Sequence, residues 1–155
     1  MDVYARLKEL GIELPSPPPA GGIYTPIRQF ADKLVYTSGA GPLNSEGISL
    51  WKGKVGSDLT LEEGQAAAKC TALNILAILH RDLGDLNRIK CLVKVLGFVA
   101  CATDFYDQPK VMNAATQIFI DVFGDPEGRA ARSAVGTNAL PDNTPVEIEL
   151  VLELK

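Results

Sequence analysis

The sequence predicts an α+β domain in which one mixed β-sheet carries two helices on a single face. Two segments with helical periodicity, residues 60–83 and 107–123, lie among segments whose composition favours strands. Strands and helices alternate in the middle of the chain and two strands follow one another at its end, an order typical of one mixed sheet. With 155 residues, the chain is long enough for one domain with a hydrophobic core.

The start of the chain is expected to form a short helix followed by an extended arm. Apolar side chains recur at helical spacing in residues 1–11, and a glycine closes that segment. Residues 15–22, PSPPPAGG, exclude regular structure and favour a polyproline II arm. We therefore expect two parts, an N-terminal helix and Pro-rich arm over residues 1–22 and a domain over residues 23–155.

The next segments favour a hairpin and then a long helix. Residues 23–30 and 34–38 have the composition of strands, and the three residues between them suit a turn. A weaker extended segment is expected over residues 48–55. Thr60 and Glu63 have the spacing of a capping box, which predicts that a long helix begins here.

The second half of the chain predicts one more helix and three more strands. Residues 89–101 are mostly apolar and rich in β-branched side chains, as in an interior strand. Asp107 can cap the second helix, whose apolar residues recur at helical spacing as far as Gly124. Residues 131–139 and 146–154 are predicted strands, and a turn separates them.

The last predicted strand indicates that one face of the sheet has no cover within the chain. Five apolar residues, from Val146 to Leu154, alternate strictly with Glu147, Glu149, Val151 and Glu153. The apolar side must lie under the two helices, so the opposite side meets either water or another subunit. A solvated surface is the simpler interpretation for Glu149 and Glu153.

Composition narrows the function. The chain has 15 Lys and Arg against 19 Asp and Glu, a net charge of -4 that disfavours a nucleic-acid groove. Its single histidine, His80, excludes a paired-histidine site, and we interpret it as a surface or subunit-interface residue. The three cysteines form no CxxC pair, and neither a signal peptide nor a membrane helix is evident. We therefore expect a cytoplasmic protein without a metal, a cofactor or a membrane contact.

Several short motifs resemble a known family. The segment ARSAV at residues 131–135, followed by LP at 140–141 and VEIE at 146–149, resembles the C-terminal signature of the YjgF/RidA family. This family is also labelled the L-PSP endoribonuclease family. Upstream, YTSG at 36–39 and GKVG at 53–56 resemble further motifs of the same family, in the same order.

The resemblance implies a chorismate-mutase-like fold and a homotrimer whose sheets pack together around its centre. The pockets of this family lie in clefts between adjacent subunits. Its deaminase members hydrolyse reactive enamines and imines, such as 2-aminoacrylate, to 2-keto acids and ammonia. The implied ligand is therefore a small imine or 2-keto acid that bears a carboxylate.

The resemblance also implies roles for individual residues. Arg132 would hold the substrate carboxylate, because its planar guanidinium can bind a carboxylate in a bidentate manner. Glu147 would orient and activate the attacking water. The other substrate-binding residues implied by the resemblance are Tyr24, Ser38, Gly39, Asn113 and Ala134.

Two other functions stay open from the sequence. The same Arg132 would serve a trimeric binder or sensor of small carboxylates or 2-keto acids that performs no turnover. The family's other label implies an endoribonuclease or translation inhibitor, against which the negative net charge and the single histidine weigh. Ala134 stands where many deaminase members have a cysteine, and the N-terminal arm is unlike the short archetype. The sequence thus indicates a divergent subgroup.

Overall fold

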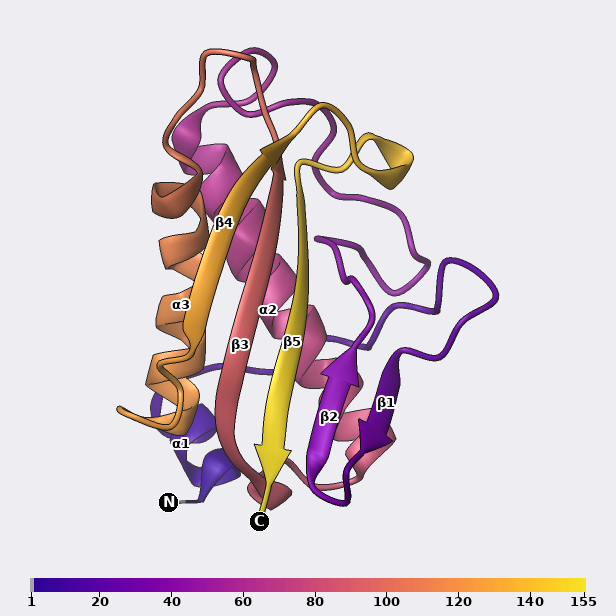
Figure 1. The fold of residues 1–155 in the computed structure, drawn as a ribbon, viewed down its shortest axis with the longest axis vertical. Coiled ribbons are helices and arrows are strands. Elements are labelled where there is room, and N and C mark those ends of the chain that lie inside the picture. Colours follow the sequence, from indigo (N-terminus) through magenta and orange to yellow (C-terminus); the bar gives the residue numbers. More distant parts are fainter. Residues whose placement is uncertain (1) are drawn as a thin grey trace.

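A computed structural model describes residues 2–155, in which five strands form one sheet with helices against one face (Figure 1). The elements in chain order are α1 (Val3–Glu9), β1 (Ile27–Phe30), β2 (Leu34–Thr37), α2 (Leu61–Leu83), the 3-10 helix η1 (Leu86–Arg88), β3 (Ile89–Ala100), α3 (Gln108–Phe123), β4 (Ala131–Thr137), the 3-10 helix η2 (Pro141–Asn143) and β5 (Val146–Leu154). The strand order is β1-β2-β5-β3-β4, and only β3 and β4 run parallel. The predicted mixed sheet is confirmed.

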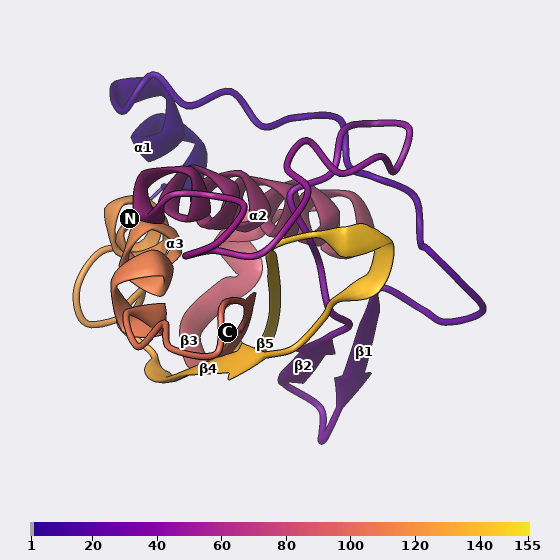
Figure 2. The ribbon, with the colours of Figure 1, turned by 90° about the horizontal axis from the view of Figure 1, so that it is seen from above.

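Helices α2 and α3 form one layer and the sheet forms the other (Figure 2). The other face of the sheet carries no helix, as the strand pattern predicted. The third helix, α1, lies on the outer side of the helical layer and packs against α3 and η1. Its buried Val3 and Leu7 belong to the main hydrophobic core. Within residues 2–155, no helix combines the length and the hydropathy that a bilayer span requires.

Strand β5 lies at the centre of the sheet and separates its two faces clearly. Ile148, Leu150 and Leu152 are buried against the helices, whereas the alternate residues Glu147 and Glu149 are half-buried on the other face. This alternation follows from the two-residue period of a strand. Because β5 pairs with β2 on one edge and with β3 on the other, it is the central strand of the sheet.

Helix α2 begins where its capping residues predicted. The Glu63 N–H donates to Thr60 Oγ1 at 3.1 Å, and the Thr60 N–H donates to Glu63 Oε2 at 2.8 Å. Each side chain thus satisfies a backbone amide that the first turn of the helix would leave without a partner.

Strand β1 is shorter than predicted. It begins at Ile27, and the predicted strand over residues 23–26 is wrong, because this segment bends. The Tyr24 N–H donates to the Gly22 carbonyl at 3.1 Å, within the segment itself. Pro26 has no N–H to donate to a sheet ladder, so pairing starts only after it.

The weak extended segment predicted over residues 48–55 is not a strand. Isolated bridges occur here instead, such as the pairing of Val55 with Cys101. Gly53 has a φ of 113°, a left-handed conformation that interrupts an extended chain. The segment is therefore a long connection that leads from the hairpin to α2.

One strand boundary and one helix cap in the second half also differ from the predictions. Strand β4 ends at Thr137 rather than at residue 139, because Thr137 Oγ1 donates to the Ala139 carbonyl and the chain turns. Asp107 occupies the N-cap position of α3, but its side chain caps no amide of the first turn. It pairs with Lys110 at 3.1 Å instead.

Candidate functional site

Arg132 is held against α3 by two hydrogen bonds from a single nitrogen. Its Nη1 donates to Asn113 Oδ1 at 2.9 Å and to Thr116 Oγ1 at 3.0 Å. Both partners lie on α3 three residues apart, so they share one face of the helix. Thr116 Oγ1 in turn donates to the Met112 carbonyl at 3.0 Å, which fixes the hydroxyl. The guanidinium is therefore oriented by the helix.

The rest of the Arg132 guanidinium is available to a ligand. Within residues 2–155, its Nε and Nη2 groups donate to no protein acceptor, and no carboxylate pairs with it. Nε–H and Nη2–H form the planar edge that matches the two oxygens of a carboxylate. The residue is half-buried, which strengthens an ion pair relative to one in open water. This arrangement suits the capture of a carboxylate.

Ala134 follows Arg132 by two residues on the same face of β4. It is half-buried against the hydrophobic core and pairs with Gly97 of β3. Its methyl group offers neither a proton nor a nucleophile, so the surface next to Arg132 is chemically inert on this side.

A cavity of about 640 Å³ brings together most of the other predicted residues. Tyr24, Ser38, Gly39 and Glu147 all line it. The Pro-rich arm supplies one wall through residues 18–21, and helix α2 supplies another. The volume lies within the range of small-molecule sites. Arg132, Asn113 and Ala134 are not among the residues that line this cavity.

Glu147 is the acidic centre of this cavity. Burial raises the pKa of its carboxyl, and the negative charge of Glu149 raises it further. No hydrogen bond to another described residue contributes to this shift. A carboxyl whose pKa is raised binds a proton more readily than an exposed glutamate, which suits it to accept a proton from water and return it.

Gly39 leaves the space that the Glu147 side chain occupies. A Cβ at Gly39 would lie 2.9 Å from Glu147 Cγ and would overlap the carboxylate. The residue before it, Ser38, donates its hydroxyl to the Thr25 carbonyl at 2.7 Å. Tyr24 Oη accepts a hydrogen bond from the Gly21 N–H at 3.0 Å. Ser38 and Tyr24 thus hold the cavity wall in place.

Arg132 and Glu147 lie on opposite faces of the sheet. Arg132 pairs with Val95 of β3, whereas Glu147 pairs with Phe98. Three positions separate Val95 from Phe98, an odd number that places their neighbours on different faces. The same spacing moves them roughly 10 Å apart along the strand direction. One protomer therefore does not join the two residues in a single pocket.

The sequence interpretation missed two features near the predicted residues. The first is Thr116, which accepts a hydrogen bond from Arg132. This contact depends on how β4 packs against α3, which no local sequence pattern predicts. Glu149, interpreted as solvated, is half-buried and lines the cavity with Glu147. Its carboxylate accepts a hydrogen bond from the Tyr36 hydroxyl at 3.0 Å, which raises the pKa of Tyr36. The shared face of Glu147 and Glu149 was the available signal.

Within residues 2–155, no group of three or more His, Cys, Asp or Glu side chains is arranged to hold an ion.

Comparison with known proteins identifies the family. Residues 4–154 match the family described as "YjgF/chorismate_mutase-like, putative endoribonuclease". The chain belongs to this family. The resemblance found in the sequence motifs is therefore confirmed, and so is the chorismate-mutase-like fold.

Similar proteins cover nearly the whole chain. Protein TCP17 of Trypanosoma cruzi is 38% identical over 152 residues, which are 98% of this chain and 94% of TCP17. The crystal structure of Atu1372 from Agrobacterium tumefaciens is 38% identical, with a TM-score of 0.88 over 99% of this chain and 92% of that one. A structure from Shewanella oneidensis, named "putative endoribonuclease", is 30% identical with a TM-score of 0.91 over 99% and 100%.

Proposed function

We propose that this protein hydrolyses reactive enamines or imines of amino-acid origin, such as 2-aminoacrylate, to 2-keto acids and ammonia. The observation that carries this proposal is the half-buried Arg132, oriented by α3 with its Nε–Nη2 edge available to a carboxylate. Glu147, a carboxyl whose pKa is raised by burial, supplies the second function.

The ligand class follows from the cation. Arg132 suits a small molecule with a planar carboxylate, which 2-imino acids and 2-keto acids share. A more distant member of the fold, TdcF of Escherichia coli, was solved with bound serine. It is 21% identical with a TM-score of 0.65, over 90% of this chain and 94% of TdcF. An amino acid bound in that protein supports a carboxylate ligand here.

The reaction needs little from the protein beyond orientation. The carbon of a protonated imine is already electrophilic, so a water molecule can add to it directly. Glu147 would accept a proton from this water as the C–O bond forms and return a proton to the nitrogen. The hydroxyl of the resulting intermediate then loses its proton to the Glu147 carboxylate as the C–N bond breaks, so that ammonia leaves and the carbonyl of the 2-keto acid forms. Arg132 would hold the substrate so that water and carbon meet in a reactive geometry.

The proposed site lies between subunits of a homotrimer. Arg132 and Glu147 lie on opposite faces of the sheet, which supports this arrangement, because a second protomer is needed to bring the two residues together. The uncovered sheet face supports it too, because large apolar side chains are exposed there. Phe30, Tyr36 and Val135 are 42%, 43% and 40% exposed. An apolar surface of this kind favours contact with another copy of the chain.

A coupled assay of 2-keto acid formation tests the activity. A PLP-dependent serine or threonine dehydratase generates the imine in situ, and the appearance of the 2-keto acid is followed with and without this protein. We expect the natural chain to accelerate hydrolysis over the spontaneous rate. We expect the Arg132→Ala variant to give no acceleration while its oligomeric mass stays the same. An active Arg132→Ala protein would contradict the assignment.

A binder without turnover is the second candidate. Ala134, which places no reactive group beside Arg132, is the feature that favours it. Saturable binding of 2-ketobutyrate that Arg132→Ala abolishes, together with no acceleration in the dehydratase assay, would identify a sensor rather than an enzyme.

A further inference from the structure

The Pro-rich arm supplies part of the cavity that Glu147 lines. It leaves α1, passes over the outer side of the helical layer and reaches β1 (Figure 2). Residues 18–21 of the arm line the cavity, and Pro18 is buried, although most of the arm is exposed. The arm is therefore a wall of this cavity as well as a connection between two elements.

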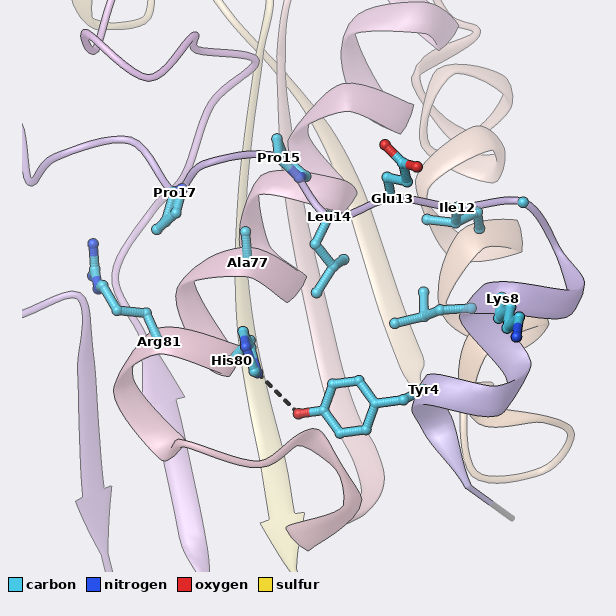
Figure 3. Close-up of a pocket in the computed structure, with 12 residues that line it drawn as sticks. Tyr4, Lys8, Ile12, Glu13, Leu14, Pro15, Pro17, Ala77, His80 and Arg81 are labelled. Carbon is cyan, nitrogen blue, oxygen red and sulfur yellow. Dashed lines mark hydrogen bonds between the residues drawn. The ribbon is translucent and has the colours of Figure 1, made fainter.

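Contacts along the arm hold this wall in place. At its start, Tyr4 Oη of α1 lies 2.9 Å from Nδ1 of His80 on α2 (Figure 3). At its end, an amide of the arm donates to Tyr24 Oη at 3.0 Å. Between these points the Pro19 ring lies against Gly47, where an added Cβ would be 3.3 Å from Pro19 Cγ. The ring of a proline also fixes its own φ, so this wall is stiff.

Much of the cavity wall beyond Glu147 is apolar. Helix α2 supplies Ile75 and Ile78, which are only 1% and 9% exposed and belong to the core. The arm supplies Pro18, and the connection after β2 supplies the half-buried Leu43. A molecule that fills this part of the cavity would contact hydrocarbon, which favours an apolar group.

The charged residues of the cavity are acidic. Among the described residues that line it, Asp142, Glu147 and Glu149 can carry a charge as carboxylates, and none is Lys, Arg or His. Asp142 pairs with Lys52 at 2.6 Å, and Glu149 accepts a hydrogen bond from a tyrosine hydroxyl at 3.0 Å. No cation of this lining can hold a substrate carboxylate. The carboxylate therefore has to lie outside it, as proposed for Arg132, and the cavity is left for the other end of the substrate.

We propose that this cavity holds the side chain of the substrate and selects 2-imino acids whose side chain is apolar and several carbons long. This inference rests on the proposed function, in which Arg132 holds the carboxylate and Glu147 the attacking water. 2-Aminoacrylate has a single methylene beyond the reacting carbon and would leave most of the 640 Å³ empty. A longer chain would contact Pro18 and Ile78 and would remove more apolar surface from water.

Binding of 2-keto acids of increasing length to the intact protein tests this preference. These products are stable, so calorimetry can compare pyruvate, 2-ketobutyrate, 2-ketopentanoate and 2-ketohexanoate. We expect the Kd to fall about fourfold for each added methylene, and Arg132→Ala to abolish binding of the whole series. A Kd that stays constant or rises with length, while binding still depends on Arg132, would overturn this inference and leave the proposed function intact. No Arg132-dependent binding of any member would contradict both.

Wall variants then locate the preference. Pro18→Gly removes a buried ring and is expected to raise the Kd for 2-ketohexanoate about threefold, while the Kd for pyruvate stays the same. Pro17→Gly is the matched control, because Pro17 belongs to the same arm but is not part of this lining (Figure 3). It should change neither Kd. An equal effect of Pro17→Gly, or an equal loss of pyruvate binding in Pro18→Gly, would contradict the role of the arm.

A variant on α2 tests the opposite contribution without altering the arm. Ile78→Val shortens a wall side chain by one methyl group and should raise the Kd for 2-ketohexanoate about twofold, again without changing the Kd for pyruvate. Ile118→Val makes the same change at a buried position of α3 that does not line the cavity, and it should have no effect on either Kd. Equal Kd values in the two isoleucine variants would show that Ile78 does not contact the substrate side chain.

Discussion

The Glu147 carboxylate occupies the place where a side chain on Gly39 would begin. The nearest Glu147 methylene, Cγ, is 2.9 Å from an ideal Cβ at residue 39. That distance is shorter than a carbon–carbon contact allows, so any side chain there must displace the glutamate. The position of the proposed proton acceptor thus depends on a glycine of the neighbouring segment.

Gly39→Ala is expected to lower imine hydrolysis roughly ten- to a hundredfold, because a small displacement of a reacting group has a large effect on rate. Gly41→Ala is the matched control, since a Cβ at Gly41 meets only ordinary contacts at 3.6 Å and beyond. Steady-state rates and thermal melting of both variants check the prediction. If Gly39→Ala hydrolysed the imine as fast as the natural chain and Gly41→Ala, the placement of Glu147 would be unimportant.

Thr116→Val should weaken substrate binding by about three- to tenfold, because Arg132 loses one of its two orienting partners. Valine has the shape of threonine without the hydroxyl, and Thr116→Ser keeps the hydroxyl. We expect serine to retain most of the affinity for 2-ketobutyrate, measured by calorimetry. A serine variant as weak as the valine variant would point to packing rather than to the hydrogen bond.

Glu147→Gln should raise the melting temperature at pH 7.5, and this gain should shrink as the pH falls toward 4. Burial raises the pKa of Glu147, so the folded protein binds this proton more tightly than the unfolded chain does. The stability that the group contributes is therefore present at low pH and lost as the pH rises through the raised pKa. Glutamine cannot ionise and avoids this loss.

Glu153→Gln is the control, because the pKa of Glu153 is shifted in the opposite direction to that of Glu147. Its hydrogen bond with Lys90 lowers the pKa of Glu153, so its contribution is present near neutral pH and is lost on acidification. We expect a slightly lower melting temperature at pH 7.5 and no difference from the natural chain at low pH. The same pH trend in both variants would contradict the assigned burial of Glu147.

Val135→Lys tests the uncovered sheet face. The register of the sheet places Val135 beside Phe98 and Glu147 on this face. A charge there should prevent close packing of a second copy and lower the mass in solution from trimer to monomer, measured by light scattering. Ala66→Lys, on an exposed position of α2, is the control and should not change the mass. A trimer that tolerates Val135→Lys would assemble through another surface.

The sequence predicted those elements whose signals lie within a few residues of one another. The alternation in β5 and the capping box of Thr60 and Glu63 are both confirmed, because each depends on residues close together in the chain. The predicted start of β1 was wrong, since the composition of residues 23–26 favours a strand while Pro26 prevents pairing. The constraint was visible in the sequence, because a proline has no N–H to donate to a sheet ladder.

The arrangement of the candidate site could be predicted only in part. The motifs singled out Arg132 and Glu147, but the strand pattern alone does not say which face each residue takes relative to the other. That relationship depends on the register of β3 with both neighbours, where Val95 and Phe98 are the partners. Long-range pairing of this kind leaves no signal in a single sequence.

Subunit mixing tests the central claim most directly. Arg132→Ala and Glu147→Ala proteins are each prepared as inactive trimers, mixed in denaturant and refolded together. If each site takes Arg132 from one protomer and Glu147 from its neighbour, every mixed trimer contains one intact site, and random mixing should restore roughly a quarter of the natural activity. Folded mixed trimers that stay inactive would contradict a site shared between subunits.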